Sequence, residues 1–245
     1  MTAAGPADRA EELAARLAAV RVRIAAACAT AGRDPAEVSL LAVTKTVPAA
    51  DVLTLMDLGL DAFGENRVQE AGAKVAEVAG VRPGARWHLV GGLQRNKARA
   101  AVGWADRVES VDSPRLADAL DAAARRAVDA GRRDGPLSVL LQLSVDGDPE
   151  RGGVPSEGLL PLAEHVSRCA GLQLDGLMVV APLGADPEPA FVATAAAAAR
   201  LRERFPQART LSAGMSGDLE AAIVHGSHVV RVGTALVGER RLTSP

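Results

Sequence analysis

Short apolar runs alternate with amphipathic stretches along most of the chain. The first run covers 38–43 and leads directly into Thr44, Lys45 and, shortly afterwards, Pro48. A continuous apolar run with such a stop is typical of a strand buried on both faces of a parallel sheet. The same reading predicts further strands near 60–63, 86–90, 107–111, 137–143, 174–179, 209–212 and 228–232.

Amphipathic segments precede and separate these strands. A helix over about 7–31 is predicted by apolar residues at spacings of three and four: Leu13, Leu17, Val20, Ile24 and Cys28. Other helices are expected near 49–58, 67–79, 94–102, 115–130, 156–170, 188–204 and 218–224. This alternation predicts an α/β fold: a single (β/α)₈ TIM barrel over about 38–240 with an extra N-terminal helix, forming one domain over 1–245. The alternative is an open doubly wound sheet, which the lack of a glycine-rich dinucleotide fingerprint disfavours.

Composition narrows the class of protein. The 245 residues are 48% hydrophobic and 24% charged, as in ordinary globular proteins, and the net charge of -2 offers no basic field for nucleic acid. The two cysteines, Cys28 and Cys169, form no paired motif, which disfavours a disulfide framework or a zinc knuckle. No signal peptide or membrane-spanning run is visible, so we expect a cytoplasmic protein. We also expect it to be a monomer.

Polar and glycine-rich segments follow several strands. In a barrel the carboxyl ends of the strands converge on one face, where the chemistry is carried out. Lys45 emerges there from an apolar layer, and desolvation would make it a better nucleophile. The alternative is an ordinary solvated lysine. The other strand ends carry Glu65-Asn66, His88 with Gly91-Gly92, Met178, and the segments 212–216 and 231–234.

The loops after the last two strands have the features of a phosphate site, which such barrels commonly place there. Gly214 and Gly233 permit close backbone approach, and Ser216 and Thr234 supply hydroxyl groups. Ser216 also lies where a short helix is expected to begin, so that free N–H groups would face an anion. The acidic residues of that first turn should then point away: Asp218 and Glu220. A helix cap and a tight turn are the alternative interpretation.

A lysine on the first strand and a phosphate site on the last two suggest an aldehyde that carries a phosphate. Pyridoxal 5'-phosphate (PLP) has both groups, forms a Schiff base with a lysine, and commonly has an acidic or arginine partner at its ring nitrogen. Arg231 lies two residues before Gly233, on the same face of its strand, from which it could reach the ring nitrogen. A salt bridge within the barrel mouth is the alternative for Arg231.

Several ordered motifs make the sequence similar to a known family. They are AVTKT at 42–46, GENRVQE at 64–70, WHLVGGLQRNK at 87–97, GMSGDLEAAI at 214–223 and VRVGTA at 230–235. The chain resembles the YggS/PROSC family of pyridoxal phosphate homeostasis proteins, which looks like the alanine racemase N-terminal barrel domain standing alone.

The resemblance implies roles for individual residues. Lys45 would form the Schiff base and Arg231 would face the ring nitrogen. The other implied cofactor contacts are Ser216, Gly233 and Thr234 around the phosphate, Met215 beside the phosphate loop, and Asn66 near the oxygen side of the ring. We also place Ser212 and His88 in the cofactor site, with a structural partner as the alternative for His88. For Glu65, Gln69 and Glu70 we expect helix-dipole stabilisation.

The same residues bear on turnover. Arginine can only donate hydrogen bonds, so a ring nitrogen facing it stays unprotonated and the cofactor is a weak electron sink. The chain contains no tyrosine, which excludes the second base that alanine racemase uses. We therefore expect a PLP buffer and carrier that serves apo PLP-dependent enzymes and is not itself an enzyme. The alternatives are a weak racemase or transaminase-like enzyme on small amino acids, and a barrel that binds another phosphorylated metabolite without a Schiff base.

Overall fold

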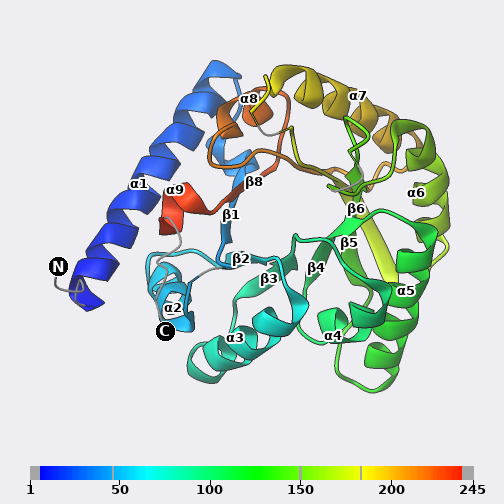
Figure 1. The fold of residues 1–245 in the computed structure, drawn as a ribbon, viewed down its shortest axis with the longest axis horizontal. Helices are drawn as coiled ribbons and strands as arrows, with labels where there is room; N and C mark the ends of the chain where they lie inside the picture. The colour runs from blue at the N-terminus through cyan, green and yellow to red at the C-terminus, as the bar shows by residue number, and fades with distance from the viewer. Residues whose placement is uncertain (1–5, 46, 149–150, 183, 239–245) are drawn as a thin grey trace.

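Parallel strands form a closed barrel at the centre of the molecule (Figure 1). The computed structural model describes residues 6–45, 47–148, 151–182 and 184–238. Each strand pairs with its neighbour in sequence, and β8 returns to pair with β1. The strands are β1 (Ser39–Val43), β2 (Ala62–Glu65), β3 (Arg86–Leu89), β4 (Arg107–Val111), β5 (Leu137–Leu143), β6 (Leu172–Val179), β7 (Thr210–Ser212) and β8 (Val229–Val232).

Helices surround this barrel on the outside (Figure 1). They are α1 (Pro6–Thr30), α2 (Ala49–Asp57), α3 (Val68–Val81), α4 (Ala98–Val102), α5 (Pro114–Asp129), α6 (Leu159–Ser167), α7 (Glu188–Arg204), α8 (Leu219–Val224) and α9 (Thr234–Val237). Short 3-10 turns occupy Pro35–Glu37, Arg95–Lys97 and Ser156–Gly158. The predicted (β/α)₈ barrel is confirmed, and the open doubly wound sheet is wrong because β1 and β8 pair. Thr46 of the first motif, and the predicted domain's ends at 1–5 and 239–245, lie outside the described residues.

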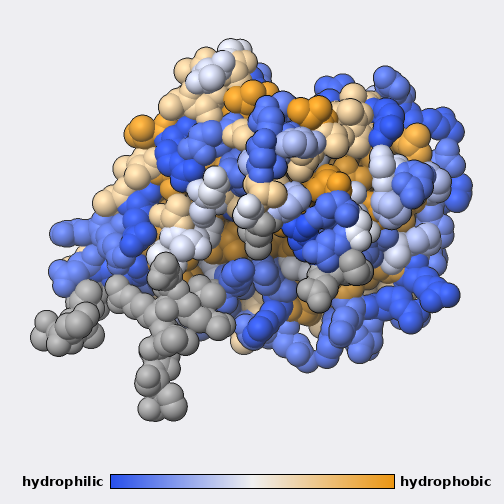
Figure 2. All heavy atoms as spheres, turned by 45° about the horizontal axis from the view of Figure 1, so that its top comes forward, coloured by the Kyte–Doolittle hydropathy of each residue, from blue (hydrophilic) through white to orange (hydrophobic). Residues whose placement is uncertain are grey.

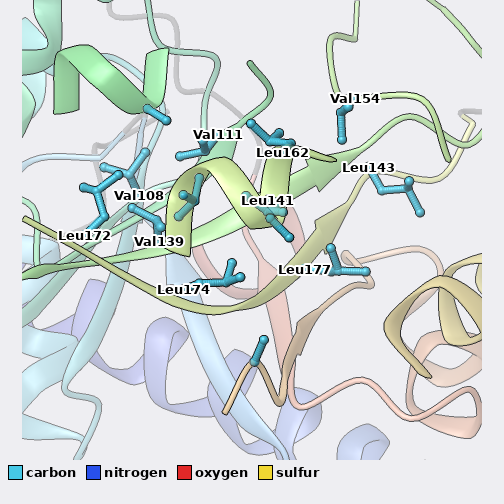
Figure 3. Packing of buried hydrophobic residues seen from close by; sticks show 14 of the residues in the cluster. Val108, Val111, Val139, Leu141, Leu143, Val154, Leu162, Leu172, Leu174 and Leu177 are labelled. Carbon is cyan, nitrogen blue, oxygen red and sulfur yellow. The ribbon is translucent and has the colours of Figure 1, made fainter. Parts of the chain in front are cut away.

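The main core lies between the strands and the outer helices (Figure 3). Side chains alternate across a strand, so every second residue of β5 faces outward. Val139, Leu141 and Leu143 accordingly pack in one cluster with Leu162 of α6. Full burial of such a side chain contributes about 1.5–3 kcal/mol to folding. The apolar runs that predicted the strands therefore also supply the outward-facing side chains on which the helices pack.

Helix α1 belongs to a second buried cluster, which it forms with residues of β1, α2, β8, α8 and α9. Its apolar stripe is buried, with Leu13 and Leu17 at 0% and 2% exposure, and it packs against α2, α8 and α9. The helix ends at Thr30, and the chain turns at Gly32, whose φ of 64° suits glycine, while Arg33 N donates to Cys28 O at 2.9 Å. The predicted N-terminal helix is thus present over nearly the expected range.

The inside of the barrel is more polar than its outside. Near the amino ends of the strands, Arg107 donates to Ser138 and to Asp175 at 2.7 and 3.0 Å. A small apolar group of Leu41, Ala62 and Val229 also lies inside the barrel. The molecular face in Figure 2 is largely hydrophilic, with smaller apolar areas between. Within the described ranges, no helix has the length and apolar character needed to cross a membrane.

Candidate functional site

A cavity of about 730 Å³ opens at the carboxyl ends of the strands. Residues that end or follow β1, β2, β3, β6, β7 and β8 line it, which is where (β/α)₈ barrels carry their sites. The lining residues are Val43, Lys45, Asn66, Val90, Val180, Met215, Ser216, Gly217, Arg231, Gly233, Thr234, Val237 and Gly238.

Lys45 lies two residues beyond β1, and its side chain is exposed at this cavity. The expected desolvation of Lys45 is therefore wrong: the apolar layer ends below it, at Thr44, which is fully buried. Thr44 Oγ1 donates to Glu65 Oε1 at 2.7 Å, and Lys74 Nζ donates to both Glu65 Oε1 and Thr44 O at 2.8 and 2.6 Å. These bonds fix the backbone from which Lys45 projects.

Glu65 thus differs from the expectation that it serves the helix dipole. It is the last residue of β2, is 1% exposed, and forms an ion pair with Lys74 of α3. The prediction failed because the strand continues beyond residue 63, which turns the carboxylate into the barrel wall. Its role here is to tie the end of β2 to β1 and α3.

Arg231 is the buried cation of the cavity. Its side chain reaches the cavity from β8, although the residue is only 4% exposed. The guanidinium donates from NH1 to Ser212 Oγ at 2.8 Å and from NH2 to Val179 O at 2.6 Å. Burial lowers the pKa of Arg231 from its ordinary value, and the Glu109 carboxylate opposes that effect. The group remains a cation at neutral pH because the ordinary arginine pKa is so high.

A buried hydrogen-bonded chain supports Arg231 from below. Ser212 Oγ, which accepts from Arg231, donates to Glu109 Oε2 at 2.6 Å, and His88 Nδ1 lies 2.7 Å from Glu109 Oε1. Burial alone would raise the pKa of Glu109, but the bond from His88, the charge of Arg231 and the Ser212 bond outweigh it, so that the pKa lies below its usual value. An ionised Glu109 accepts both bonds and supplies the negative charge that Arg231 needs.

The loops after β7 and β8 meet at one end of the cavity. Ser216 Oγ accepts a hydrogen bond from Ala235 N at 3.2 Å, which joins the two loops. Arg23 of α1 donates to Ser216 O at 2.9 Å and to both oxygens of Glu220. Hydroxyl and backbone donors are the groups that hold a phosphate at such loops.

Three details of these loops differ from expectation. Helix α8 begins at Leu219, one residue after the predicted 218, so Ser216 lies in the loop before it and not at its first turn. In that loop Asp218 Oδ1 accepts a hydrogen bond from Met215 N at 2.5 Å. Asp218 therefore closes its own loop, while Glu220 does face away toward α1. Gly214 has a φ of 91°, and a Cβ there would lie 2.6 Å from Ala222 Cβ. Its lack of a side chain lets the loop pack on α8, not on an anion.

The structure brings most of the predicted site residues to one cavity. Lys45, Asn66, Met215, Ser216, Arg231, Gly233 and Thr234 all line it. His88 and Ser212 do not line this cavity and lie in the chain beneath Arg231. His88 instead borders a cavity of about 190 Å³ whose lining includes the first residues of β1 and β3. Glu109 is therefore the partner of His88, which corresponds to the structural alternative that the sequence analysis gave for this histidine.

Sequence reasoning missed Glu109 and the close approach of Gly91 to Asn66. Glu109 is a carboxylate inside a buried strand, which was an available signal because such a charge needs partners. At Gly91 a Cβ would lie 2.3 Å from Asn66 O, so only glycine lets the loop after β3 approach Asn66. That approach depends on tertiary structure and left no signal in the sequence.

Comparisons with known proteins agree on one family. The model of the alanine racemase N-terminal domain matches residues 15–241. A pyridoxal phosphate homeostasis protein of Mycobacterium tuberculosis is 48% identical over 97% of this chain and 96% of its own length. The protein of that name in Escherichia coli is 38% identical over 94% of this chain and 97% of its own.

Solved structures agree with these relatives. PipY of Synechococcus elongatus, solved with PLP bound, is 38% identical, has a TM-score of 0.79, and is matched over 92% of this chain and 100% of its own. Alanine racemase of Corynebacterium glutamicum, at 16% identity and a TM-score of 0.68 over 96% of this chain and 62% of its own, shares the fold. This chain belongs to the family of pyridoxal phosphate homeostasis proteins, which is built on the alanine racemase N-terminal domain.

Proposed function

We propose that this protein binds PLP in the cavity at the barrel mouth and acts in intracellular PLP homeostasis as a buffer and carrier. One observation carries the proposal: a lysine amine, a buried arginine and two joined hydroxyl-bearing loops share a single cavity of about 730 Å³. That volume is in the usual range for small-molecule sites. Relatives that are pyridoxal phosphate homeostasis proteins, and the PLP bound in the structure of PipY, support the same ligand.

The residues present fit the groups that PLP carries. When bound, PLP supplies an aldehyde that condenses reversibly with a primary amine and releases water. Lys45 is the amine we assign to it, because the chain has three lysines and the others are placed elsewhere. Lys74 is bonded to Glu65 and Thr44, and Lys97 does not line the cavity.

The loops after β7 and β8 would hold the phosphate. Ser216, Gly233 and Thr234 supply the donors, and Met215 and Asn66 border the same space. Arg231 would donate to the ring nitrogen, with its fork oriented by Ser212 and Val179 O. A donor at that nitrogen keeps the ring a weak electron sink, which favours holding the cofactor over turning over amino acids.

The position of Lys45 favours hand-over. The Lys45 side chain is exposed, so an amine of another protein or of a free amino acid can reach the PLP carbon to which Lys45 would be joined. Reversible exchange of one amine for another is the chemistry that a carrier for apo PLP-dependent enzymes needs.

The visible spectrum of the purified protein, before and after borohydride, tests the proposal. We expect a yellow absorption band that reduction removes, with pyridoxyl mass on the peptide of Lys45. Lys45→Ala should lose the band, and Lys97→Ala should keep it. A protein that takes up no added PLP would overturn the proposal, and a band retained in Lys45→Ala would overturn the role of Lys45.

Amino-acid turnover is a separate measurement on the same protein. Exchange of the α-proton of alanine into deuterated water should stay at the level of free PLP. Exchange well above that level, lost in Lys45→Ala, would replace the carrier by the weak enzyme.

A further inference from the structure

A second group of reactive side chains lies far from the cavity, between the outer helices α5 and α6. Asp118 comes from α5, His165 from the last turn of α6, and Cys169 from just beyond the end of α6. Their ligand-type atoms all lie within 4.8 Å of one another. His165 Nε2 is 2.6 Å from Asp118 Oδ1. Figure 1 shows α5 and α6 as neighbours on the side of the barrel opposite α1.

We propose that Asp118, His165 and Cys169 form a binding site for a divalent transition metal of the zinc class. The site stands apart from the proposed function and does not depend on it. Imidazole nitrogen, thiolate sulfur and carboxylate oxygen are the ligands that zinc takes in proteins, and three of them leave a fourth, tetrahedral position for water.

The distances suit such a site. With metal–ligand bonds of about 2.0–2.3 Å, tetrahedral ligand atoms lie roughly 3.4 Å apart. The present separations lie on both sides of that value, from 2.6 Å between His165 Nε2 and Asp118 Oδ1 to at most 4.8 Å, and side-chain rotation can bring them to it. The side chains of His165 and Asp118 are 31% and 63% exposed, so an ion and its water can enter from solvent.

The backbone around Cys169 is already fixed against α5. Asp121, one turn after Asp118, accepts a hydrogen bond from Gly171 N at 2.7 Å. A Cβ at Gly171 would lie 2.8 Å from Asp121 O, so the segment after α6 packs directly on the α5 backbone. This contact holds the sulfur near the other two groups before any ion binds.

The charges favour a dication. The carboxylates of Asp118 and Asp121 lie close to Cys169 and place negative charge around its sulfur. On binding, the S–H bond breaks, its proton passes to solvent, and sulfur bonds to the metal. His165 binds as the neutral ring with its hydrogen on Nδ1. Thiolate and carboxylate then offset the two positive charges of the ion.

Cobalt(II) provides the test, because a thiolate ligand gives it a near-ultraviolet charge-transfer band that other ligands do not. Titration of the purified protein should produce this band at one equivalent, together with visible ligand-field bands of tetrahedral strength, and zinc should abolish both. Difference spectra against the same PLP-loaded protein remove the absorption of the cofactor. Zinc should also raise the midpoint of thermal unfolding, because it binds the folded state.

Matched variants locate the ligands. Cys169→Ser should remove the charge-transfer band, whereas Cys28→Ala should keep it, since Cys28 lies on the buried face of α1. His165→Gln and Asp118→Asn should weaken cobalt affinity at least about tenfold, the loss expected even for outer partners of a metal site. His225→Gln is the control, because its Nε2 also lies 2.6 Å from a carboxylate, that of Glu188. No thiolate band at saturating cobalt, or a band that survives in Cys169→Ser, would overturn the site.

Discussion

Glu109 supplies the counter-charge of Arg231 inside the barrel. Its side chain is completely buried and, through Ser212, connects to the guanidinium that borders the mouth cavity. A buried cation without a counter-charge is costly, and the loss of one partner is more harmful than the loss of both. Glu109 therefore contributes to stability and to the orientation of Arg231 together.

Replacing Glu109 with glutamine should lower the free energy of unfolding by roughly 3 kcal/mol, because Arg231 keeps its charge and loses its counter-ion. Urea unfolding monitored by circular dichroism measures the change. Glu70→Gln is the control: Glu70 pairs with Arg67 on the surface, and its loss should cost less than about 1 kcal/mol. Equal effects in the two variants would contradict the role of Glu109.

Two adjacent glycines give a sharp comparison at the next strand end. A Cβ at Gly91 would lie 2.3 Å from Asn66 O, whereas one at Gly92 would meet nothing within 4 Å. Gly91→Ala should therefore cost about 1–3 kcal/mol and displace Asn66, and Gly92→Ala should stay within about 0.5 kcal/mol. Thermal unfolding and PLP titration of both variants measure the effect. If Gly91→Ala behaves like Gly92→Ala, the loop after β3 does not constrain Asn66.

At the scale of elements, α1 supports the two segments that we assign to the phosphate, those that follow β7 and β8. Arg23 donates to Ser216 O in the loop after β7, and Arg9 donates to Val237 O at the end of α9 at 2.9 Å. The Arg23 guanidinium also holds the pKa of Glu220 below its usual value. The helix that precedes the repeating unit thus holds both loops of the cavity in place.

Arg23→Met should weaken PLP binding about fivefold, the equivalent of one hydrogen bond of about 1 kcal/mol, with Lys45 still the modified residue. Arg16→Met is the matched control on the same helix, because Arg16 pairs with Glu12 of α1 itself. Absorbance titration measures the PLP affinity of both variants. Borohydride reduction followed by peptide mass analysis identifies the lysine that is modified in each. An unchanged affinity in Arg23→Met would show that the loop after β7 holds its shape without α1.

Most of this architecture could be predicted from the sequence, because side chains buried between strands and helices leave a repeating apolar pattern. Strands such as β5 could be recognised directly, since nearly all their residues are apolar. Helix α9 could not, because its four residues are too few to show a helical period. Helix α8 was expected over 218–224 and is found over Leu219–Val224. The hydrogen bond from Met215 N to the side chain of Asp218 could not be foreseen, because apolar periodicity does not reveal such a local contact.

Most residues of the candidate site could likewise be predicted from the sequence. Lys45, Arg231 and the loops after β7 and β8 follow from where strands end, and they do line one cavity. The positions of His88 and Ser212 beneath that cavity depend on Glu109, which faces them from β4. Such a contact between distant strands is fixed by barrel closure and not by spacing along the chain.

For the whole molecule, buried titratable groups predict that acid weakens the fold in two stages. Burial and the charge of Arg33 lower the pKa of His228, and His228 Nδ1 accepts a hydrogen bond from Leu211 N at 3.2 Å, which needs the neutral ring. The unfolded chain therefore binds this proton at higher pH than the folded one. Stability is lost first as pH falls through the ordinary histidine range.

The second stage comes from carboxylates. The folded pKa of Glu109 is below its usual value, so the stability it contributes at neutral pH is lost as pH falls from the ordinary carboxyl range through that lower value. Urea midpoints measured across this range should show both stages. His228→Gln should remove the upper one and Glu109→Gln the lower one. A profile unchanged in both variants would contradict the assignment.

The pairing of β8 with β1 has a consequence for synthesis of the chain. Lys45 leaves the ribosome long before Arg231, and the two share a cavity only once β8 has closed against β1. A nascent chain that stops short of β8 would carry the reactive amine without the arginine, the last loop or α9. Retention of PLP at the proposed site therefore requires a completed barrel. The absorbance of bound PLP can then serve as a folding probe to which incomplete chains do not contribute.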